Sequence, residues 1–304
     1  MLTISLTEPV PIPFDFEAAA RSHGWSALAP FTWDADTKTL SRVQRLQGSG
    51  KVVRLHLCQG HPNGAAPFVA VEVETVELLT PGEEAEIRRA VRRMVRLDED
   101  FSEFYELCAQ AEGWTLRVQP GGGRLLRCPT LFEDIVYTLC TTNITWAGTK
   151  RLVERLTALL GEPFPGRDEW RAFPTPAAIT AAGPEVLRQE IRLGYRSGYI
   201  WELASAVAEG RLDLSTLEDP ALPTAELMRR LRQIKGVGPY AAATLLMILG
   251  RYEHLAVDTE LVSHVSKKYF GGQPAGEAEM RGIYAPWGRW QYLAYWFDAP
   301  AEDR

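Results

Sequence analysis

The residues best suited to chemistry lie near the C-terminal end, where a glycine pair precedes a lone acid. Gly236 and Gly238 flank Val237, and Asp258 follows further along the chain. Glycine adopts positive φ at little cost, so both glycines are expected to shape a tight hairpin. Pro239 suits the first turn of a helix. Backbone N–H groups at a helix start attract anions, and a DNA phosphate is the obvious candidate. A plain packing corner is the alternative.

The hairpin is expected to join two helices, within about residues 227–250. On its far side, apolar residues recur at three- and four-residue steps, as an amphipathic helix requires: Ala242, Leu245, Leu246 and Leu249. Lys235 precedes the hairpin and is expected to face solvent or phosphate. Asp258 has two readings, because an Asp before an apolar segment is also a good helix N-cap. We favour chemistry for this carboxylate, and the two roles are compatible.

Length and composition describe an ordinary globular protein. The chain has 304 residues, 46% of them hydrophobic and 24% charged, and a formal net charge of −6. It is long enough for two domains, and no segment reads as a signal peptide or membrane span. The acidity lies mostly outside residues 121–270. A modest nucleic-acid face is therefore compatible with the charge, whereas a strongly electrostatic binder is not.

The cysteines argue against two kinds of cofactor. Cys58, Cys108, Cys128 and Cys140 show no Cys-x-x-Cys spacing. Neither a zinc site nor an iron–sulfur cluster is indicated. Reduced thiols in a cytoplasmic protein are expected, and no cofactor is predicted.

The fold class indicated is α+β, with an N-terminal antiparallel β module followed by a mainly helical region. Residues 1–80 contain apolar or alternating runs at 40–46, 52–57 and 68–73 between turn signals. Residues 81–304 show helical periodicity broken by Pro/Gly stretches. Helices are expected at 131–139, 150–160 and 201–209, with another starting at Pro176 behind Thr175.

A helix opening near Glu83 carries five arginines: Arg88, Arg89, Arg92, Arg93 and Arg96. Contact with DNA is one reading of this face. We favour a solvated helix face that pairs with nearby acids.

In this order the elements resemble the helix-hairpin-helix superfamily of base-excision DNA glycosylases, in its 3-methyladenine II and 8-oxoguanine branches. The resemblance covers most of the chain. It rests on the hairpin with Asp258 and on four further blocks in register, at residues 123–130, 139–144, 193–196 and 288–295. It implies an enzyme that flips a damaged base out of duplex DNA, because the glycosidic bond is unreachable in the stack.

The resemblance also implies roles for single residues. Asp258 would face the anomeric carbon and orient or deprotonate a water. Asn143 would fill the gap left by the flipped base, and Tyr195 with Arg196 would prop the duplex open. The alternatives are a capped turn for Asn143, core packing for Tyr195 and a surface charge for Arg196. Gly236, Val237, Gly238 and Tyr240 would lie along the DNA backbone. Carbonyls of Ile234 and Val237 would ligate a structural monovalent cation.

The base pocket would be lined by Trp290, Gln291 and Tyr295. The aromatic density of this segment suits stacking on an electron-poor base. The alternative is a C-terminal helix that packs its aromatic side chains into the core.

Departures from the family pattern bear on specificity and mechanism. Tyr240 stands where the 8-oxoguanine enzymes carry a Schiff-base lysine, and a phenol forms no imine. Leu28 and Gly148 stand where those enzymes recognise 8-oxoguanine and the opposite cytosine. The chain is therefore expected to be a monofunctional glycosylase for alkylated purines, which leave readily as cationic bases.

Two other functions stay open. One is an oxidised-base glycosylase with lyase activity, and the other is a non-catalytic nucleic-acid-binding protein of the same fold. Double-stranded DNA containing a damaged base is the expected partner of the glycosylase, whereas the non-catalytic alternative would bind DNA or RNA. A monomer is expected. In a bacterium the protein would be associated with the nucleoid.

Overall fold

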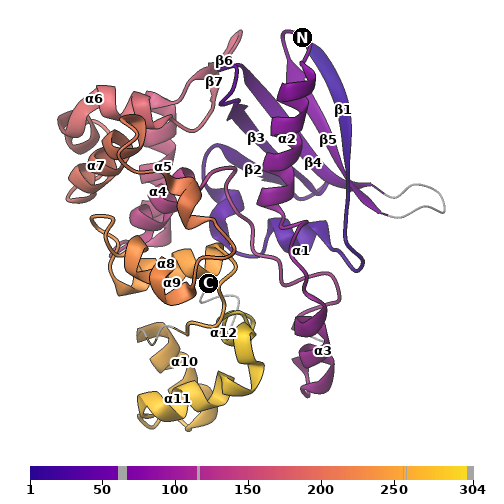
Figure 1. The fold of residues 1–304 in the computed structure, drawn as a ribbon, viewed down its shortest axis with the longest axis vertical. Helices are drawn as coiled ribbons and strands as arrows, with labels where there is room; N and C mark the ends of the chain where they lie inside the picture. The colour runs from indigo at the N-terminus through magenta and orange to yellow at the C-terminus, as the bar shows by residue number, and fades with distance from the viewer. Residues whose placement is uncertain (61–66, 115–116, 256, 258, 300–304) are drawn as a thin grey trace. The chain divides into compact units, whose positions relative to one another are not determined.

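The chain forms two compact units, each assembled from two separate stretches. The computed structural model describes residues 1–60, 67–114, 117–255, 257 and 259–299 (Figure 1). Met1–Glu99 and Arg124–Thr216 make unit 1, and Asp100–Gly123 and Leu217–Arg304 make unit 2.

Unit 1 contains an antiparallel five-stranded sheet in the order β1-β5-β4-β3-β2 (Figure 1). Residues at alternate positions of the central strands, among them Leu55, Leu57 and Val71, are fully buried. This period of two is what placed the strands in the sequence, so the predicted β module is confirmed. The strands are β1 (Leu2–Pro9), β2 (Phe31–Asp34), β3 (Thr39–Arg45), β4 (Val52–Gly60) and β5 (Phe68–Thr75). Two short helices, α1 (Phe16–Ala20) and η1 (Gly24–Ala27), lie between β1 and β2.

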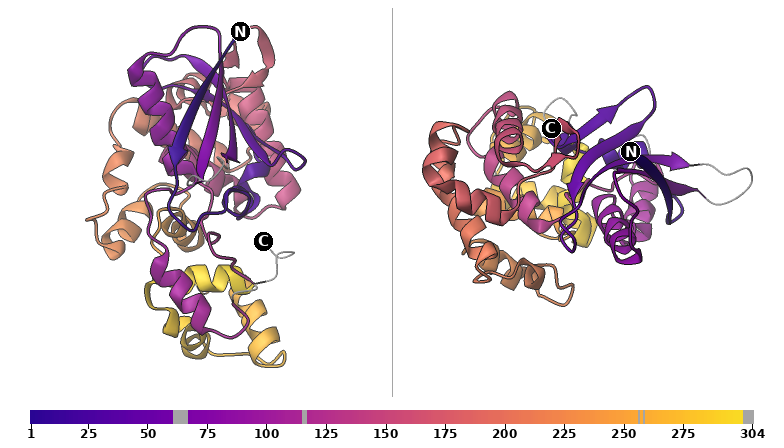
Figure 2. Two further views of the ribbon diagram at one scale, coloured as in Figure 1. Left: turned by 90° about the vertical axis from the view of Figure 1, so that its right-hand side faces the viewer. Right: turned by 90° about the horizontal axis from the view of Figure 1, so that it is seen from above.

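Helix α2 (Pro81–Met94) lies across one face of that sheet (Figures 1 and 2). It begins with a capping box, in which Thr80 and Glu83 each bind the other's backbone N–H. Four of the five arginines that the sequence assigned to this helix pair with acids, as the favoured interpretation predicted, although Arg96 lies beyond its end. The pairs are Arg88 and Arg92 with Glu8, Arg93 with Asp134, and Arg96 with Glu99. Arg96 is buried, however, so part of this set is not a solvated face.

The remaining helices of unit 1 are α4 (Leu131–Thr141), α5 (Trp146–Leu160), α6 (Pro176–Gln189) and α7 (Arg196–Ala208). Thr175 caps α6 as predicted, accepting the Ala178 N–H at 3.1 Å. Helix α7 begins five residues earlier than expected, because only Gly194 takes a positive φ (61°) and Gly198 continues the helix. A short hairpin, β6 (Pro163–Phe164) with β7 (Arg167–Arg171), was not anticipated, since β6 has only two residues and β7, Arg-Asp-Glu-Trp-Arg, shows no apolar alternation.

Unit 2 is helical and is held together by aromatic side chains. Helix α3 (Ser102–Gln110) comes from the inserted stretch, and Phe101 and Phe104 both pack against Trp290 at 5.3 Å between ring centroids. The later elements are α8 (Thr224–Leu231), α9 (Pro239–Ile248), α10 (Thr259–Tyr269), α11 (Glu277–Tyr284), η4 (Ala285–Trp290) and α12 (Gln291–Asp298). The 3-10 turn η3 (Leu214–Leu217) spans the boundary between the units.

The described part of the chain contains no helix with the length and apolar character needed to cross a membrane. Its four cysteines are unpaired thiols, three of them buried. Burial raises the pKa of Cys108 to about 11 and of Cys140 to about 12, and it also raises the pKa of Cys58 and Cys128.

Candidate functional site

The predicted hairpin is present, between α8 and α9. Its turn is closed by the Val237 N–H, which donates to the Ile234 carbonyl at 3.0 Å, and both side chains are buried. Gly236 has φ 88°, which only glycine adopts without strain. Gly238 has φ −80°, in the extended region. Of the two glycines, only Gly236 therefore uses the positive φ that glycine allows.

Gly238 serves a different purpose from Gly236. A Cβ built at this position meets nothing within 4 Å, so neither strain nor packing inside the protein requires glycine. Gly238 is the N-cap of α9 and has no side chain to occupy the first-turn N–H groups, while Pro239 takes the first helical position. The start of α9 thus presents bare backbone. Lys235 and Tyr240 beside it are exposed.

Two expectations attached to the hairpin stay predictions. Asp258 lies outside the described residues, although α10 begins at the next residue, Thr259. The carbonyl of Ile234 accepts the Val237 N–H and retains a second lone pair, which is compatible with a cation ligand. Among the described residues, no group of three or more His, Cys, Asp or Glu side chains forms a metal site.

In unit 1 an exposed tip joins α4 to α5 and carries Asn143. Asn143 adopts φ 48°, a left-handed conformation that Asn tolerates better than most residues. Its Nδ2 lies 3.4 Å from the Tyr195 hydroxyl, and Thr142 Oγ1 lies 3.1 Å from the same oxygen. Tyr195 is 52% exposed. Partial burial opposes ionisation of Tyr195, but its bonds with Thr142 and Asn143 outweigh this and lower its pKa. The structure therefore brings Asn143 and Tyr195 together.

Arg196 supports this tip from inside. The side chain is 6% exposed, donates Nε to the Leu139 carbonyl at 3.1 Å and donates Nη2 to the Thr142 carbonyl. Its guanidinium also covers the Tyr195 ring at 4.5 Å. The prediction of an Arg196 that touches DNA needs correction, because these bonds commit the side chain to the end of α4. The block at 193–196 pointed to the right place but could not show which way Arg196 faces.

Gly148, in the first turn of α5, also shapes the tip. A Cβ at this position would lie 2.5 Å from Ile144 Cγ1, closer than two carbons approach. A long polar side chain there would displace Ile144, which is exposed beside Asn143. The tip therefore presents an aliphatic group next to an amide and a phenol.

The three predicted base-pocket residues lie in the core of unit 2 or bond within it. Trp290 is 4% exposed, stacks on Tyr252 at 5.4 Å and donates its indole N–H to Glu103 at 2.9 Å. Tyr295 is 6% exposed and packs edge-on against Tyr284. Gln291 donates Nε2 to the Gly288 carbonyl at 2.9 Å. The described contacts of Trp290 and Tyr295 are those of core packing, and a base pocket lined by these residues stays a prediction.

A cluster of side chains centred on the carboxylate of Asp298, at the end of α12, was not predicted from the sequence. Asp298 is 5% exposed and accepts bonds from five side chains: Arg117, His264, Lys268, Tyr269 and Tyr284. Burial opposes its ionisation, but the bonds from Lys268, His264 and the two tyrosines hold the pKa of Asp298 at about 2. The only signal is an acid within an aromatic run, which is too common to be informative.

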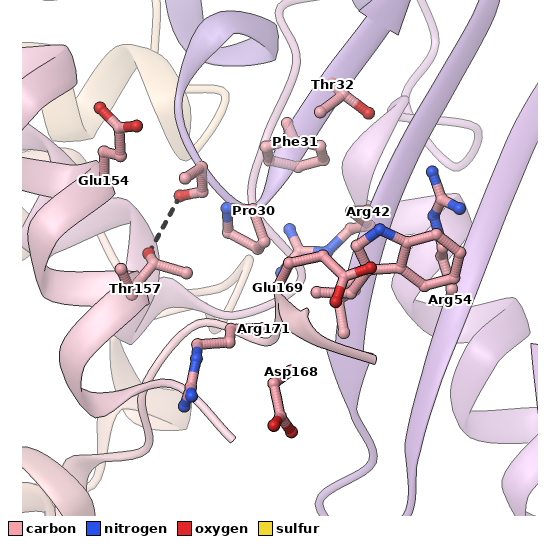
Figure 3. A pocket seen from close by; sticks show the side chains of 14 residues that line it. Pro30, Phe31, Thr32, Arg42, Arg54, Glu154, Thr157, Asp168, Glu169 and Arg171 are labelled. Carbon is pink, nitrogen blue, oxygen red and sulfur yellow. Dashed lines mark hydrogen bonds between the residues drawn. The ribbon is translucent and has the colours of Figure 1, made fainter. Parts of the chain in front are cut away.

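Unit 1 also contains a cavity of about 450 Å³, which none of the predicted residues lines (Figure 3). It lies among β2, β3, α5 and β7. Arg54 stacks on the Trp170 ring at 3.8 Å in its wall, and Thr157 bonds the Ala29 carbonyl at 3.5 Å. The lining includes the acids Glu154, Asp168 and Glu169 and the arginines Arg42, Arg54 and Arg171, so both signs of charge are present. A lining with both acidic and basic side chains does not indicate one class of ligand.

Comparison with known proteins identifies the architecture. No family model matches the chain. A protein of Escherichia coli (strain K12) named DNA-3-methyladenine glycosylase 2 is 24% identical over 176 residues, which span 58% of this chain and 60% of that protein. The 3-methyladenine DNA-glycosylase of Archaeoglobus fulgidus superimposes with a TM-score of 0.73 at 22% identity, covering 98% of this chain and 97% of that one. The fold is that of the helix-hairpin-helix DNA glycosylases. The resemblance indicated by the sequence motifs is confirmed at this level.

A second solved structure has the same fold. It is the Clostridium acetobutylicum 8-oxoguanine glycosylase/lyase in complex with double-stranded DNA containing cytosine opposite 8-oxoguanine. The TM-score is 0.66 at 17% identity, over 94% of this chain and 91% of that chain. Both branches named by the motif resemblance are therefore represented among these glycosylase folds.

Proposed function

We propose that the protein is a DNA glycosylase that hydrolyses damaged bases from duplex DNA, with Asp258 as its catalytic carboxylate. The observation that carries the proposal is the helix-hairpin-helix, with bare backbone at Gly238 and a carboxylate soon after it in the sequence. The likeness to glycosylase folds over nearly the whole chain supports it.

Each described part of the site has a task in this proposal. The hairpin binds a phosphate through the N–H groups at the start of α9, where the helix dipole favours negative charge. The tip at Asn143 and Tyr195 enters the duplex beside the flipped nucleotide. Its polar groups are already oriented by Thr142 and Arg196, so little conformational entropy is lost when DNA binds.

The chemistry assigned to Asp258 is stabilisation of positive charge on the sugar. As the bond to the base breaks, the anomeric carbon develops oxocarbenium character, and a nearby carboxylate stabilises it. The same carboxylate orients or deprotonates the attacking water. Tyr240 follows the hairpin in place of a lysine, which supports hydrolysis without a covalent imine.

The substrate class we propose is an alkylated purine. Alkylation at N3 or N7 gives the base a positive charge, so it leaves without strong acid catalysis, and one carboxylate suffices. The names of the Escherichia coli and Archaeoglobus fulgidus proteins are consistent with this choice. Ile144 at the tip, packed over Gly148, supports a site without an arginine that inspects the opposite base.

A panel of duplexes, each with one defined lesion, tests the proposal. The expected result is release of 3-methyladenine or 7-methylguanine under single-turnover conditions, and loss of at least about 100-fold in rate for Asp258→Asn, because one transition-state charge interaction is removed. Binding to duplex DNA should persist in that variant. Release of no base from any duplex would identify a non-catalytic binding protein.

Borohydride treatment during the reaction tests the mechanism. A monofunctional enzyme leaves no protein–DNA adduct, because no imine forms. A covalent adduct, or preferential release of 8-oxoguanine, would establish the oxidised-base glycosylase/lyase instead.

A further inference from the structure

The carboxylate of Asp298 joins three helices and one loop of unit 2. Its Oδ2 accepts bonds from His264 Nε2 at 2.9 Å, Tyr269 Oη at 2.7 Å and Tyr284 Oη at 2.9 Å. Its Oδ1 accepts from Lys268 and Arg117. Both carboxylate oxygens are thus in use, and each is bound from more than one direction.

Three of these five partners belong to α10. His264 and Lys268 are four residues apart and therefore share one face of the helix, and Tyr269 ends it. Apolar contacts alone allow a helix to slide or rotate slightly in its groove, because they have no preferred direction. Directed hydrogen bonds to one fixed acceptor permit a single position. Asp298 therefore fixes α10 both along and around its axis.

The residue before α10 is Asp258. Asp258 lies outside the described residues, and helix α10 begins at the next residue in the sequence, Thr259. Building on the function proposed above, we propose that Asp298 is a positioning residue for the reaction: its bonds to α10 set the position of the helix that follows the proposed catalytic acid in the sequence. Asp298 touches neither the base nor the sugar in this proposal.

The charge of Asp298 suits this role. Removing one hydrogen-bond partner from a buried carboxylate leaves the others to compensate, whereas neutralising the carboxylate weakens every bond at once. Asp298→Asn has nearly the same shape but loses one acceptor oxygen and the charge. It is therefore the sharpest single change available.

The experiment compares catalysis with binding in four variants of the full-length protein. Single-turnover base release is measured at a temperature well below each variant's unfolding midpoint. Binding is measured with a duplex that carries a tetrahydrofuran abasic-site analogue. Asp298→Asn should slow base release by at least about 10-fold, since a misplacement of about 1 Å can cost on the order of 100-fold, while the Kd changes by less than about 2-fold.

Lys268 variants provide a graded test that keeps the inference falsifiable if Asp298→Asn folds poorly. Lys268→Met removes one bond between α10 and Asp298 and should give a smaller loss of rate. Lys268→Arg restores a cation at the same position and should recover most of it.

Glu103→Gln is the matched control. Like Asp298, Glu103 is an acid that accepts hydrogen bonds from a cation, Arg289, and from an aromatic side chain, Trp290. Neither of these partners belongs to α10. It should keep the wild-type rate. An unchanged rate in Asp298→Asn, or an equal loss in Glu103→Gln, would overturn the positioning role while leaving the proposed function intact. A wild-type protein that releases no base would instead refute the proposed function itself, and this inference with it.

Discussion

The hairpin of unit 2 and the tip of unit 1 present different kinds of chemistry. At the hairpin, a Cβ on Gly238 would meet nothing, and the start of α9 exposes main-chain groups beside the side chains of Lys235 and Tyr240. At the tip, Asn143 and Tyr195 present side chains, and a buried arginine holds the backbone beneath them. Main-chain N–H groups suit a phosphate, which every nucleotide has, whereas side chains can distinguish what lies inside the duplex.

This difference determines how each region tolerates mutation. A main-chain site depends on backbone conformation and on the absence of a side chain in front of the N–H groups. A side-chain site depends on a network in which each group orients the next. A substitution at the hairpin can therefore change DNA affinity without changing folding stability. At the tip, a substitution that breaks the network should lower both.

The largest effect is expected from Arg196→Met. This change removes two hydrogen bonds from a charged donor, to the carbonyls of Leu139 and Thr142, and should lower the free energy of unfolding by about 2–3 kcal/mol. Each carbonyl keeps a weaker neutral donor, the Thr142 hydroxyl and the Tyr195 hydroxyl respectively. DNA binding should weaken as well, because the tip loses its support. Denaturant unfolding and binding titrations measure the two effects. A stable variant with reduced DNA affinity would show instead that Arg196 acts mainly on DNA.

The two hairpin glycines form a matched pair with a smaller effect. Gly236→Ala forces a Cβ into a left-handed backbone and should cost about 1–2 kcal/mol of folding stability. Gly238→Ala should leave stability within about 0.5 kcal/mol of wild type, because its backbone is extended and its Cβ meets nothing. Its affinity for DNA should nevertheless fall, since the new methyl group occupies the space in front of α9. Equal DNA affinity for Gly238→Ala and wild type would remove the phosphate-binding role.

The smallest effect is expected from Tyr195→Phe. It removes the hydroxyl that Asn143 and Thr142 bind and keeps the ring beside Arg196. A cost of about 1 kcal/mol in DNA affinity is expected, from looser orientation of Asn143. Asn143→Ala provides the comparison, and the double variant should lose less than the sum of the two single losses. Strict additivity in this cycle would mean that the two residues act independently.

The sequence was most informative where the physics is local. Glycine, proline and the apolar period mark the hairpin without any knowledge of its surroundings, and Thr175 marks the start of α6 for the same reason. Which glycine serves which purpose could not be predicted, because the sequence does not distinguish a glycine needed for its φ from one needed for open space. The colours of Figure 1 show that unit 1 combines elements distant in the sequence. Contacts between such elements, here between the start of α7 and the end of α4, decide which way a side chain such as Arg196 points.

Burial explains the other differences. From the sequence, Trp290 and Tyr295 fit a stacking surface and a core equally well. Only their contacts in the fold, of Trp290 with Phe101 and of Tyr295 with Tyr284, show that both side chains are packed inside unit 2. Asp298 gave no local signal, since its five partners come from positions between 117 and 284. Long-range clusters of this kind have no period and no spacing rule, so a single sequence does not reveal them.

The buried cysteines have a practical consequence. A thiol reacts with electrophiles as its thiolate, and the raised pKa values of Cys58, Cys108, Cys128 and Cys140 keep the thiolate fraction very small at neutral pH. The folded protein should therefore resist methylating reagents of the kind that damage DNA. A cysteine introduced at the exposed Ala147, beside the tip, should react first with a maleimide dye. Duplex binding to this tip becomes observable by fluorescence without removal of any native cysteine.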